Sequence, residues 1–527
     1  MPEYHTAPSP CRGACPVGGR IAEWIHQVGN GDMFGAWQTL TDNNPFPAIA
    51  GRICHHPCEV ACNRRQLDET VGICSLERFV GDKALEQGWG FPLPEVEQAK
   101  SVAVVGGGPA GLSAAYQLRR RGYAVTVIEK TPQLGGLLRY GIPGYRLDKY
   151  ILDGEVQRII DMGVEIRLGE TISGKQGLQD LRSEFDAVYL ATGACRSKNL
   201  PSLDYAKAWV TDSAAYLAAT NARQSCEPGE RLVVIGGGSA AMDVARTARR
   251  QGRTVSVLSL EPESLLPAQR IEVDEAIEEG VVFQCGAMLQ SVEAEEHGLI
   301  LNCVRVDFSA GAERGAFTVE SVDGGEFQLH ADGIVPAIGQ DADYSLWGDE
   351  LPGDGRVLAT DEYWRTPLPG VFAGGDLASM DRFVTAAVGM GKEAAMVIAD
   401  YLDGVEADQA TTSIPEIPFG AINASYYPAA ERNLPGTTDL SERLDSFDEV
   451  EQPLDPSQAA DEAARCFSCG TCIYCDNCYL YCPDMAIVKL ERGYRVKTDY
   501  CKGCGLCVAE CPTASIVMTE ETSVVSS

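Results

Sequence analysis

The sequence predicts an α/β fold with two similar strand–turn–helix units in its centre and a cysteine-rich segment at each end. Two near-repeats predict the central units. VAVVGGGPAGLSAAY (102–116) and RLVVIGGGSAAMDVA (231–245) each place a glycine-rich turn between a buried apolar run and a helical run. The cysteines define the ends, because six of the 20 precede residue 75 and ten lie between 466 and 511. A chain of 527 residues has room for three or four domains with sizeable cores.

Composition narrows the class of function. The net charge of −32 argues against nucleic acid or an anionic membrane as partner and suits a soluble redox protein, although a solvated acidic surface gives the same charge. No apolar run reaches about eighteen residues, so we expect no membrane span. The first residues, MPEYHTAPSP, lack the order of a signal peptide, and we expect a cytoplasmic protein. In that compartment, clustered cysteines predict metal ligation.

The first glycine-rich turn predicts a dinucleotide site. Gly106, Gly108 and Gly111 fit G-x-G-x-x-G, in which the glycines allow a tight turn and close approach of a pyrophosphate to the helix N-terminus. The next strand, AVTVIE, ends in Glu129, at about the twenty-residue offset of a ribose-binding acid. The residues expected to bind here are Gly106, Gly108, Pro109, Ala110, Gly111, Glu129 and Lys130.

The second turn repeats the pattern with Ala241 in the third glycine position, a permitted change. Two dinucleotide folds in one chain predict one site for FAD and one for a nicotinamide dinucleotide. The segment DGIVPAIGQ (332–340) is expected to close the second fold. The residues expected to bind the nicotinamide dinucleotide are Gly236, Gly238, Ser239, Ala240, Glu261 and Gly339.

The C-terminal cysteines carry the most specific pattern. Two runs fit C-x2-C-x2-C-x3-C-P, the bacterial ferredoxin pattern, in which the fourth cysteine of each run ligates the other [4Fe–4S] cluster. A zinc ribbon would not need eight cysteines at this spacing. The expected ligand sets are Cys472, Cys475, Cys478 and Cys511 for one cluster, and Cys482, Cys501, Cys504 and Cys507 for the other.

The N-terminal cysteines carry a family resemblance. The order CRGACP, GRICHHPCEVAC, VGICSLERF resembles the N-terminal iron–sulfur domain of the glutamate synthase small subunit family. That family includes the large subunit of NADH-dependent ferredoxin–NADP transhydrogenase and the N-terminal half of dihydropyrimidine dehydrogenase. The resemblance covers residues 11–400 and implies an N-terminal helical iron–sulfur domain.

The resemblance also implies N-terminal cluster ligands. One set is Cys15, Cys54, Cys58 and Glu77, with Cys74 as a competitor because a carboxylate is a rarer ligand of such iron. Cys11 and Cys62 match a second cluster, but the family's leading C-x2-C pair is missing. DEAARCFSC (461–469) looks like the family's lead-in to that pair, and we hypothesise that Cys466 and Cys469 complete the second cluster. The alternative is that both are bystanders and that one N-terminal cluster exists.

Three further segments resemble the family's flavin site. LGGLLRYGIPGYRL (134–147) is expected along the flavin, and DAVYLATGA (186–194) holds an A-T-G turn. Gly374-Gly375-Asp376 and the helical run after it imply that Asp376 binds the ribityl hydroxyls and that the helix start faces the pyrimidine end. The residues implied are Gly136, Leu137, Arg146, Ala191, Thr192, Gly193, Gly375, Asp376, Thr385 and Ala386.

The second fold carries a clue to nucleotide specificity. Family members that use NADPH usually have two arginines after the second strand, where this chain has Leu260 and Glu261. A carboxylate would repel a 2′-phosphate and accept hydrogen bonds from a free ribose diol. We therefore expect NADH to be preferred over NADPH, unless Glu261 is a solvent-facing loop residue.

These parts predict an electron-transfer oxidoreductase. We expect electrons to move between NAD(H), FAD and [4Fe–4S] clusters, with no catalytic acid or base on the protein. The expected partner is a larger redox enzyme, such as a 2-oxoacid oxidoreductase or dissimilatory sulfite reductase, or a ferredoxin. The alternatives are a self-sufficient NAD(P)H:ferredoxin oxidoreductase, with or without flavin bifurcation, and a glutamate synthase small subunit.

The expected domains follow the motifs along the chain. They are 1–98, helical iron–sulfur; 99–225, FAD-binding, first part; 226–345, NAD(H)-binding; 346–405, FAD-binding, second part; 406–460, linker; and 461–527, ferredoxin.

Overall fold

A computed structural model describes residues 1–5, 7–224, 229–311, 316–405 and 415–520. It divides into two compact units. The first combines Met1–Trp89, Glu406–Gly436 and Pro453–Ser527, and the second combines Gly90–Val405 and Thr437–Gln452. The expected boundary between residues 225 and 226 lies outside the described residues, and the one between 405 and 406 falls at the end of a described range. No helix in the described ranges is both long and apolar enough to cross a membrane.

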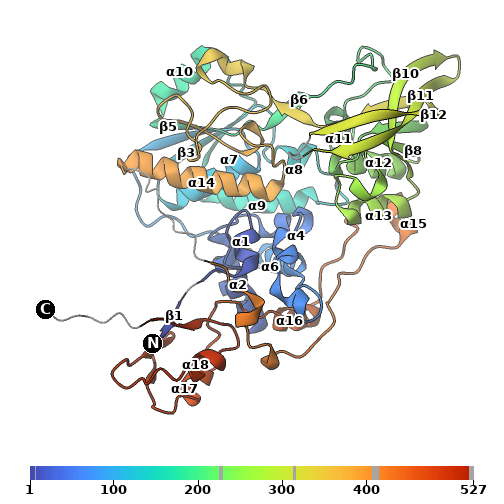
Figure 1. Cartoon of the computed structure of the whole chain (residues 1–527). Coiled ribbons are helices and arrows are strands. Elements are labelled where there is room, and N and C mark those ends of the chain that lie inside the picture. Colours follow the sequence, from blue (N-terminus) through green and yellow to red (C-terminus); the bar gives the residue numbers. More distant parts are fainter. Residues whose placement is uncertain (6, 225–228, 312–315, 406–414, 521–527) are drawn as a thin grey trace. The chain divides into compact units, whose positions relative to one another are not determined.

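The second unit begins with a parallel five-stranded sheet in the order β15-β5-β2-β3-β4. Its central strand is a run of valines and alanine, buried because helices cover both faces of such sheets. Helix α14 runs beside α7, as Figure 1 shows in orange and light blue. The strands are β2 (Ser101–Val105), β3 (Ala124–Glu129), β4 (Glu165–Leu168), β5 (Ala187–Leu190) and β15 (Val371–Ala373), and the helices are α7 (Pro109–Arg120), α8 (Leu137–Tyr140), α9 (Lys149–Asp161), α10 (Gly174–Glu184) and α14 (Val384–Asp403).

A second parallel sheet, in the order β13-β7-β8-β9, lies between β5 and β15 in the chain. Because β15 pairs with β5, the chain returns to the first sheet after completing the second. The elements are β7 (Arg231–Ile235), β8 (Thr254–Ser259), β9 (Val282–Cys285), β13 (Gly333–Pro336), α11 (Ser213–Asn221), α12 (Ser239–Arg250) and α13 (Arg270–Glu278). Strands β6 (Ala194–Ser197) and β14 (Gln340–Ala342) pair where the chain passes between the folds.

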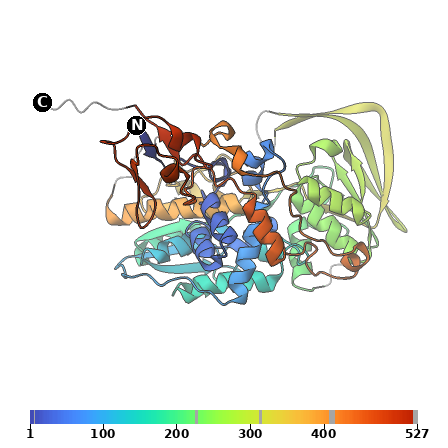
Figure 2. The ribbon, with the colours of Figure 1, turned by 90° about the horizontal axis from the view of Figure 1, so that it is seen from below.

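Three antiparallel strands and a late segment complete this unit. The strands β10 (Ala287–Glu295), β11 (Gly298–Ala310) and β12 (Phe317–Ala331) form the long yellow-green sheet at the outer side of the second fold in Figure 2. The segment Thr437–Gln452, with α15 (Leu440–Asp445), contacts both folds. Arg443 pairs with Glu278 at 3.0 Å, and the amide of Val450 donates to the carbonyl of Tyr145 at 3.0 Å.

The first unit has a helical half built around two buried tryptophans, Trp24 and Trp37. Helix α16 comes from the C-terminal part of the chain and packs on α2 and α6, as Figures 1 and 2 both show. Its capping box between Asp455 and Gln458 fixes where it begins. The helices are α1 (Pro10–Ala14), α2 (Ile21–Gly29), α3 (Met33–Thr41), α4 (Pro47–Ile53), α5 (Pro57–Val60), α6 (Ile73–Glu86) and α16 (Pro456–Ala464).

The other half of this unit contains the C-terminal cysteine runs. Two strand pairs frame them: β16 with β17, and β18 with β1, which comes from the start of the chain. The elements are β1 (Pro2–Tyr4), α17 (Asn477–Leu480), β16 (Ile487–Lys489), β17 (Tyr494–Val496), α18 (Leu506–Ala509) and β18 (Ile516–Met518).

The structure differs from the sequence-based expectation in two places. Residues 20–40 carry apolar residues at helical spacing, which predicts one helical stretch, but they form two helices, because Gly31 takes φ +77° and Asp32 caps α3 by accepting a hydrogen bond from the amide of Gly35. Helix α16 begins at Pro456, inside the segment expected to be linker. Neither difference moves a cysteine away from its expected neighbours.

Candidate functional site

The first glycine-rich turn joins β2 to α7 and forms a tight backbone cradle. A Cβ at Gly106 would lie 2.3 Å from the carbonyl oxygen of Ala191, so only glycine fits. The Glu129 carboxylate accepts a hydrogen bond from the Gly107 amide at 2.8 Å. Gly136 approaches Gly108 so closely that a Cβ there would lie 2.9 Å from the Gly108 Cα. This cradle, with Pro109, Ala110 and Gly111 in the first turn of α7, fits the pyrophosphate and ribose of FAD.

The other residues expected near the flavin surround the same turn. Thr192 and Gly193 follow β5, and Gly375 lies so near α7 that its added Cβ would be 2.8 Å from the Ala110 Cβ. Asp376 follows Gly375, and Thr385 and Ala386 are buried in the first turn of α14. The structure therefore brings the segment of Gly375, Asp376 and the start of α14 to the Gly106–Gly111 turn, as the flavin interpretation requires.

Three expected flavin residues have other surroundings. Lys130 is exposed and Leu137 is 45% exposed. The partly buried Arg146 guanidinium pairs with Asp243 at 2.9 Å and Glu272 at 2.7 Å, both in the second fold. Its contacts therefore hold the two folds together, and cofactor binding by Arg146 stays a prediction.

The second glycine-rich turn has the same geometry. A Cβ at Gly236 would lie 2.4 Å from the carbonyl oxygen of Ala337, and Gly238, Ser239 and Ala240 begin α12. Glu261 follows β8, and its carboxylate contacts the Ser259 hydroxyl. A Cβ at Gly237 would lie 3.2 Å from Glu261 Oε2, just as one at Gly107 would lie 3.3 Å from Glu129 Oε2. Glu261 thus faces the second glycine-rich turn as Glu129 faces the first. Gly339 follows the end of β13.

The two C-terminal cysteine runs exchange their fourth members. Cys472, Cys475 and Cys478 line one cavity with Cys511, and Cys482 lines another with Cys501, Cys504 and Cys507. Donors point at the sulfurs: the amide of Ala486 lies 3.2 Å from Cys482 Sγ, and that of Gly503 lies 3.4 Å from Cys501 Sγ. Four sulfurs around a cavity, with N–H groups directed at them, fit a [4Fe–4S] cluster.

A third sulfur group joins the two ends of the chain. Cys11, Cys62, Cys466 and Cys469 line one cavity, so the last two fold back to the N-terminal cysteines. Burial raises the pKa of Cys466 to about 12 and that of Cys469 to about 11. These thiols would keep their protons at neutral pH, and a metal ion that displaces the protons would stabilise the group.

The fourth group leaves its last ligand open. Cys15 lies near Cys58 and Glu77, and the Cys74 thiol is within hydrogen-bonding distance of the Cys54 and Cys58 sulfurs. Glu77 accepts a hydrogen bond from the Asn44 amide at 2.8 Å. Cys74 and Glu77, the two candidates for the last ligand, therefore both lie near cysteines of the expected set Cys15, Cys54 and Cys58.

Three neighbours of the sulfur groups were not expected as site residues from the sequence: Glu59 and Tyr4 gave no signal, and His56 was interpreted as a loop residue. Ligand atoms of His56, Glu59 and Cys74 lie within 4.8 Å of one another. The Tyr4 hydroxyl donates to Cys478 Sγ at 3.1 Å. The position of His56 two residues after Cys54 was a usable signal, whereas no local pattern links Tyr4 to Cys478.

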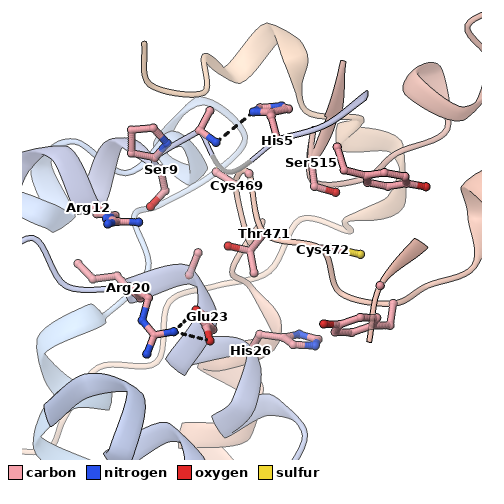
Figure 3. Close-up of a pocket in the computed structure, with 18 of the residues that line it drawn as sticks. His5, Ser9, Arg12, Arg20, Glu23, His26, Cys469, Thr471, Cys472 and Ser515 are labelled. Carbon is pink, nitrogen blue, oxygen red and sulfur yellow. Dashed lines mark hydrogen bonds and ion pairs between the residues drawn. The ribbon is translucent and has the colours of Figure 1, made fainter. Parts of the chain in front are cut away.

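A cavity of about 860 Å³ lies between two sulfur groups of the first unit (Figure 3). Its wall includes Cys469 of the third group and Cys472 of the first C-terminal group, three residues apart on one backbone stretch. Arg20 and Glu23, which pair at 3.0 Å, and His26 line another side. Both sulfur groups are therefore reached from one cavity.

Family comparisons cover most of the chain. A protein-family model described as "Pyridine nucleotide-disulphide oxidoreductase" matches residues 100–391. Models described as "Dihydroprymidine dehydrogenase domain II, 4Fe-4S cluster" and "4Fe-4S binding domain" match residues 5–89 and 494–517.

Individual relatives agree with these matches. The chain is 33% identical to the beta subunit of NADP(+)-dependent formate dehydrogenase of Moorella thermoacetica, over 88% of this chain and 70% of the relative. It is 32% identical to the glutamate synthase [NADPH] small chain of Escherichia coli, over 75% of this chain and 88% of the relative. Among solved structures, Mycobacterium tuberculosis FprA in complex with NADPH matches 70% of this chain and 99% of its own, with a TM-score of 0.50 and 15% identity, which concerns the fold alone.

Proposed function

We propose, because this chain belongs to the pyridine nucleotide-disulphide oxidoreductases related to the glutamate synthase small chain, that it is the electron-transfer subunit linking NADH to a partner redox enzyme. The chain is an oxidoreductase with an FAD- and NAD(P)-binding fold and 4Fe–4S domains at both ends. The observation that carries the proposal is the gathering of the candidate ligands into four groups within one unit.

When bound, FAD would supply acceptance of a hydride from NADH and release of single electrons, and [4Fe–4S] clusters would supply their onward transfer. The chain's residues bind and orient these groups. The Gly106–Gly111 turn and Glu129 would hold the flavin dinucleotide, and the Gly236–Ala241 turn and Glu261 would hold the nicotinamide dinucleotide. The four sulfur groups would hold iron–sulfur clusters, with Cys74 or Glu77 completing the fourth.

The share of this chain that each relative covers supports a subunit that passes electrons through its C-terminal module. The formate dehydrogenase beta subunit aligns over 88% of this chain, whereas the glutamate synthase small chain aligns over 75%. Both relatives are named as parts of larger enzymes. We therefore infer a partner chain that carries its own active site.

This function is tested by anaerobic purification from the source without a tag. A stoichiometric partner with its own active site, and about 16 iron atoms per chain at four per cluster, is the expected result. A lone chain that reduces ferredoxin with NADH would instead support the self-sufficient oxidoreductase.

The preference for NADH rests on Glu261. Its carboxylate faces the second glycine turn at the position where Glu129 faces the first, which suits a free ribose diol and repels a 2′-phosphate. The relatives' names include both nucleotides, NADP(+) in the formate dehydrogenase beta subunit and NAD in an NAD-dependent dihydropyrimidine dehydrogenase subunit of Salmonella typhimurium, so the proposal rests on Glu261 and not on the family.

We expect wild-type kcat/KM to favour NADH, and Glu261→Arg to move the NADH/NADPH ratio toward NADPH by about 10- to 100-fold, the worth of one charged hydrogen bond. Glu263→Gln, at a half-exposed glutamate nearby, is the control and should leave the ratio unchanged. A wild-type ratio that favours NADPH would contradict the preference while leaving electron transfer intact.

A further inference from the structure

The two C-terminal cysteine runs are flanked unequally in the chain. The second run, Cys501–Cys511, is preceded by β17 and followed by β18. The first run, Cys472–Cys482, is followed by β16, but the residues before it are α16 and the Cys466–Cys469 loop. One strand of an otherwise repeated arrangement is therefore absent from its place in the sequence.

The start of the chain fills that place. Strand β16 pairs antiparallel with β17, and β18 pairs antiparallel with β1, with Tyr4 opposite Ile516 as Val496 is opposite Ile487. Further hydrogen bonds extend the contact: His5 Nε2 lies 3.0 Å from the carbonyl oxygen of Ala514, and the Thr519 amide donates to the Met1 carbonyl at 2.8 Å. Residues 1–5 thus complete the repeat from the far end of the chain.

Tyr4 brings a polar group that the corresponding Val496 lacks. Its hydroxyl donates to Cys478 Sγ at 3.1 Å, and its ring stacks on Tyr494 with centroids 6.1 Å apart. Tyr4 lines both the cavity of Cys472, Cys475, Cys478 and Cys511 and the larger cavity of Figure 3. The ring therefore stands between this sulfur group and the larger cavity.

A hydrogen-bond donor to a cysteine sulfur that ligates a cluster changes the reduction potential of that cluster. Reduction adds negative charge that is shared by the sulfurs, so a hydrogen bond stabilises the reduced state more than the oxidised state. The internal repeat offers the comparison, since the group of Cys482, Cys501, Cys504 and Cys507 has a valine at the equivalent strand position.

We propose that residues 2–4 supply the missing strand of the C-terminal module, and that the Tyr4 hydroxyl raises the reduction potential of the cluster held by Cys472, Cys475, Cys478 and Cys511. Tyr4 is a positioning residue in this proposal, since it acts through Cys478. The proposal rests on the proposed function only in taking Cys478 as a cluster ligand.

The test is a redox titration of the purified full chain, followed by electron paramagnetic resonance. Tyr4→Phe keeps the ring and the strand but removes the donor. We expect one cluster to become about tenfold harder to reduce, a shift of about 59 mV downward for a one-electron couple, with unchanged iron content and unchanged potentials of the other clusters. Fluorotyrosine at position 4, a stronger donor, should shift the same cluster upward.

Tyr494→Phe is the matched control. Tyr494 packs in the same core, but its hydroxyl donates to the Asp476 carboxylate at 2.7 Å and not to a sulfur. We expect it to leave the potential of this cluster near the wild-type value. A titration that is the same for wild type, Tyr4→Phe and the fluorotyrosine protein would overturn the proposal.

Cys478→Ser separates this result from the proposed function. If that variant keeps every cluster signal of the wild type, the ligand assignment is wrong. If it loses one signal and Tyr4→Phe leaves that signal's potential unchanged, the ligand assignment stands and the role of Tyr4 is wrong.

Discussion

At Gly391 in α14, an added Cβ would lie 2.1 Å from the carbonyl oxygen of Ala110 in α7. The neighbouring Ser113 hydroxyl donates to the carbonyl of Val388 at 2.7 Å, so the two helices cross in close contact. Ala110 belongs to the first turn of α7, where the flavin dinucleotide is expected. A single methyl group here therefore acts on both the core and the cofactor site.

We expect Gly391→Ala to lower the free energy of unfolding by about 1–3 kcal/mol, the usual range for overpacking, and to weaken FAD retention. Thermal unfolding followed by release of flavin fluorescence measures both. Gly177→Ala in α10 is the control, because its Cβ would meet Ile172 at an ordinary 3.4 Å. An equal effect of the two substitutions would show that the helix crossing is not tight.

The buried carboxylate of Glu279 provides a second residue-scale prediction. It accepts hydrogen bonds from Arg250 at 2.6 Å and Arg246 at 3.0 Å. We expect Glu279→Gln to cost about 3–5 kcal/mol, because the buried Arg250 guanidinium loses its countercharge and Arg246 keeps only its ion pair with Glu275. Asp274→Asn, at a half-exposed pair with Arg270, is the control and should cost at most about 1 kcal/mol.

The Glu279 carboxylate and its two arginines also make the stability of the fold depend on pH. Burial acts to raise the pKa of Glu279, but the hydrogen bonds from Arg250 and Arg246 outweigh it and leave the pKa below the ordinary value of 4.5. The stabilisation is therefore fully present above pH 4.5 and is lost as the pH falls through the lower pKa of the folded state. The stability difference between wild type and Glu279→Gln should stay constant from neutral pH to about 5.5 and narrow below about 4.5. A constant difference down to pH 3 would contradict this.

At the scale of elements, α16 carries Cys466 and Cys469 back to the N-terminal helices. Arg465, at the end of this helix, pairs with Glu462 at 2.6 Å and with Asp68 at 3.1 Å. The Arg64 guanidinium donates to the Arg465 carbonyl at 2.9 Å. These buried bonds fix the loop that presents the two cysteines.

Substitution of both Cys466 and Cys469 by serine should remove about four iron atoms per chain, the content of one [4Fe–4S] cluster. Iron analysis and electron paramagnetic resonance measure the loss. Cys195→Ser, at an exposed cysteine of the second unit, is the control. Unchanged iron and spectra in the double variant would make both cysteines bystanders.

At the scale of the whole molecule, the two kinds of site belong to different units. The sulfur groups lie in the unit of Met1–Trp89, Glu406–Gly436 and Pro453–Ser527, and the two glycine turns lie in the other. Each unit has its own core, so loss of metal from one need not unfold the other.

Anaerobic removal of iron from this chain with a chelator should therefore leave the flavin bound and still bleached by NADH, while electron transfer from NADH to the untreated partner enzyme is abolished. Stopped-flow absorbance follows the flavin, and reduction of the partner enzyme follows the onward transfer. Reconstitution with iron and sulfide should restore the lost activity. Full reduction of the partner enzyme by the iron-free protein would exclude the clusters from the electron path.

The sequence by itself determined those features whose signal is local. The two glycine turns are set within a few residues of their strands, and the exchange of Cys482 and Cys511 follows from the ferredoxin spacing. The pairing of Cys466 and Cys469 with Cys11 and Cys62 could be formulated from the sequence only as a hypothesis, because the alternative of bystanders fits the same spacing. The family resemblance supplied Gly375 and Asp376 as expected flavin residues. The return of β15, which precedes them, to the first sheet agrees with that expectation.

Only the tertiary structure decided which distant groups meet. It brought the Tyr4 hydroxyl to Cys478 across 474 positions of sequence and gave Arg146 two carboxylates of the second fold as partners. It also placed both Cys74 and Glu77 beside the same cysteines. Such contacts depend on how whole elements pack and not on the period or spacing of any one segment, so no local pattern encodes them.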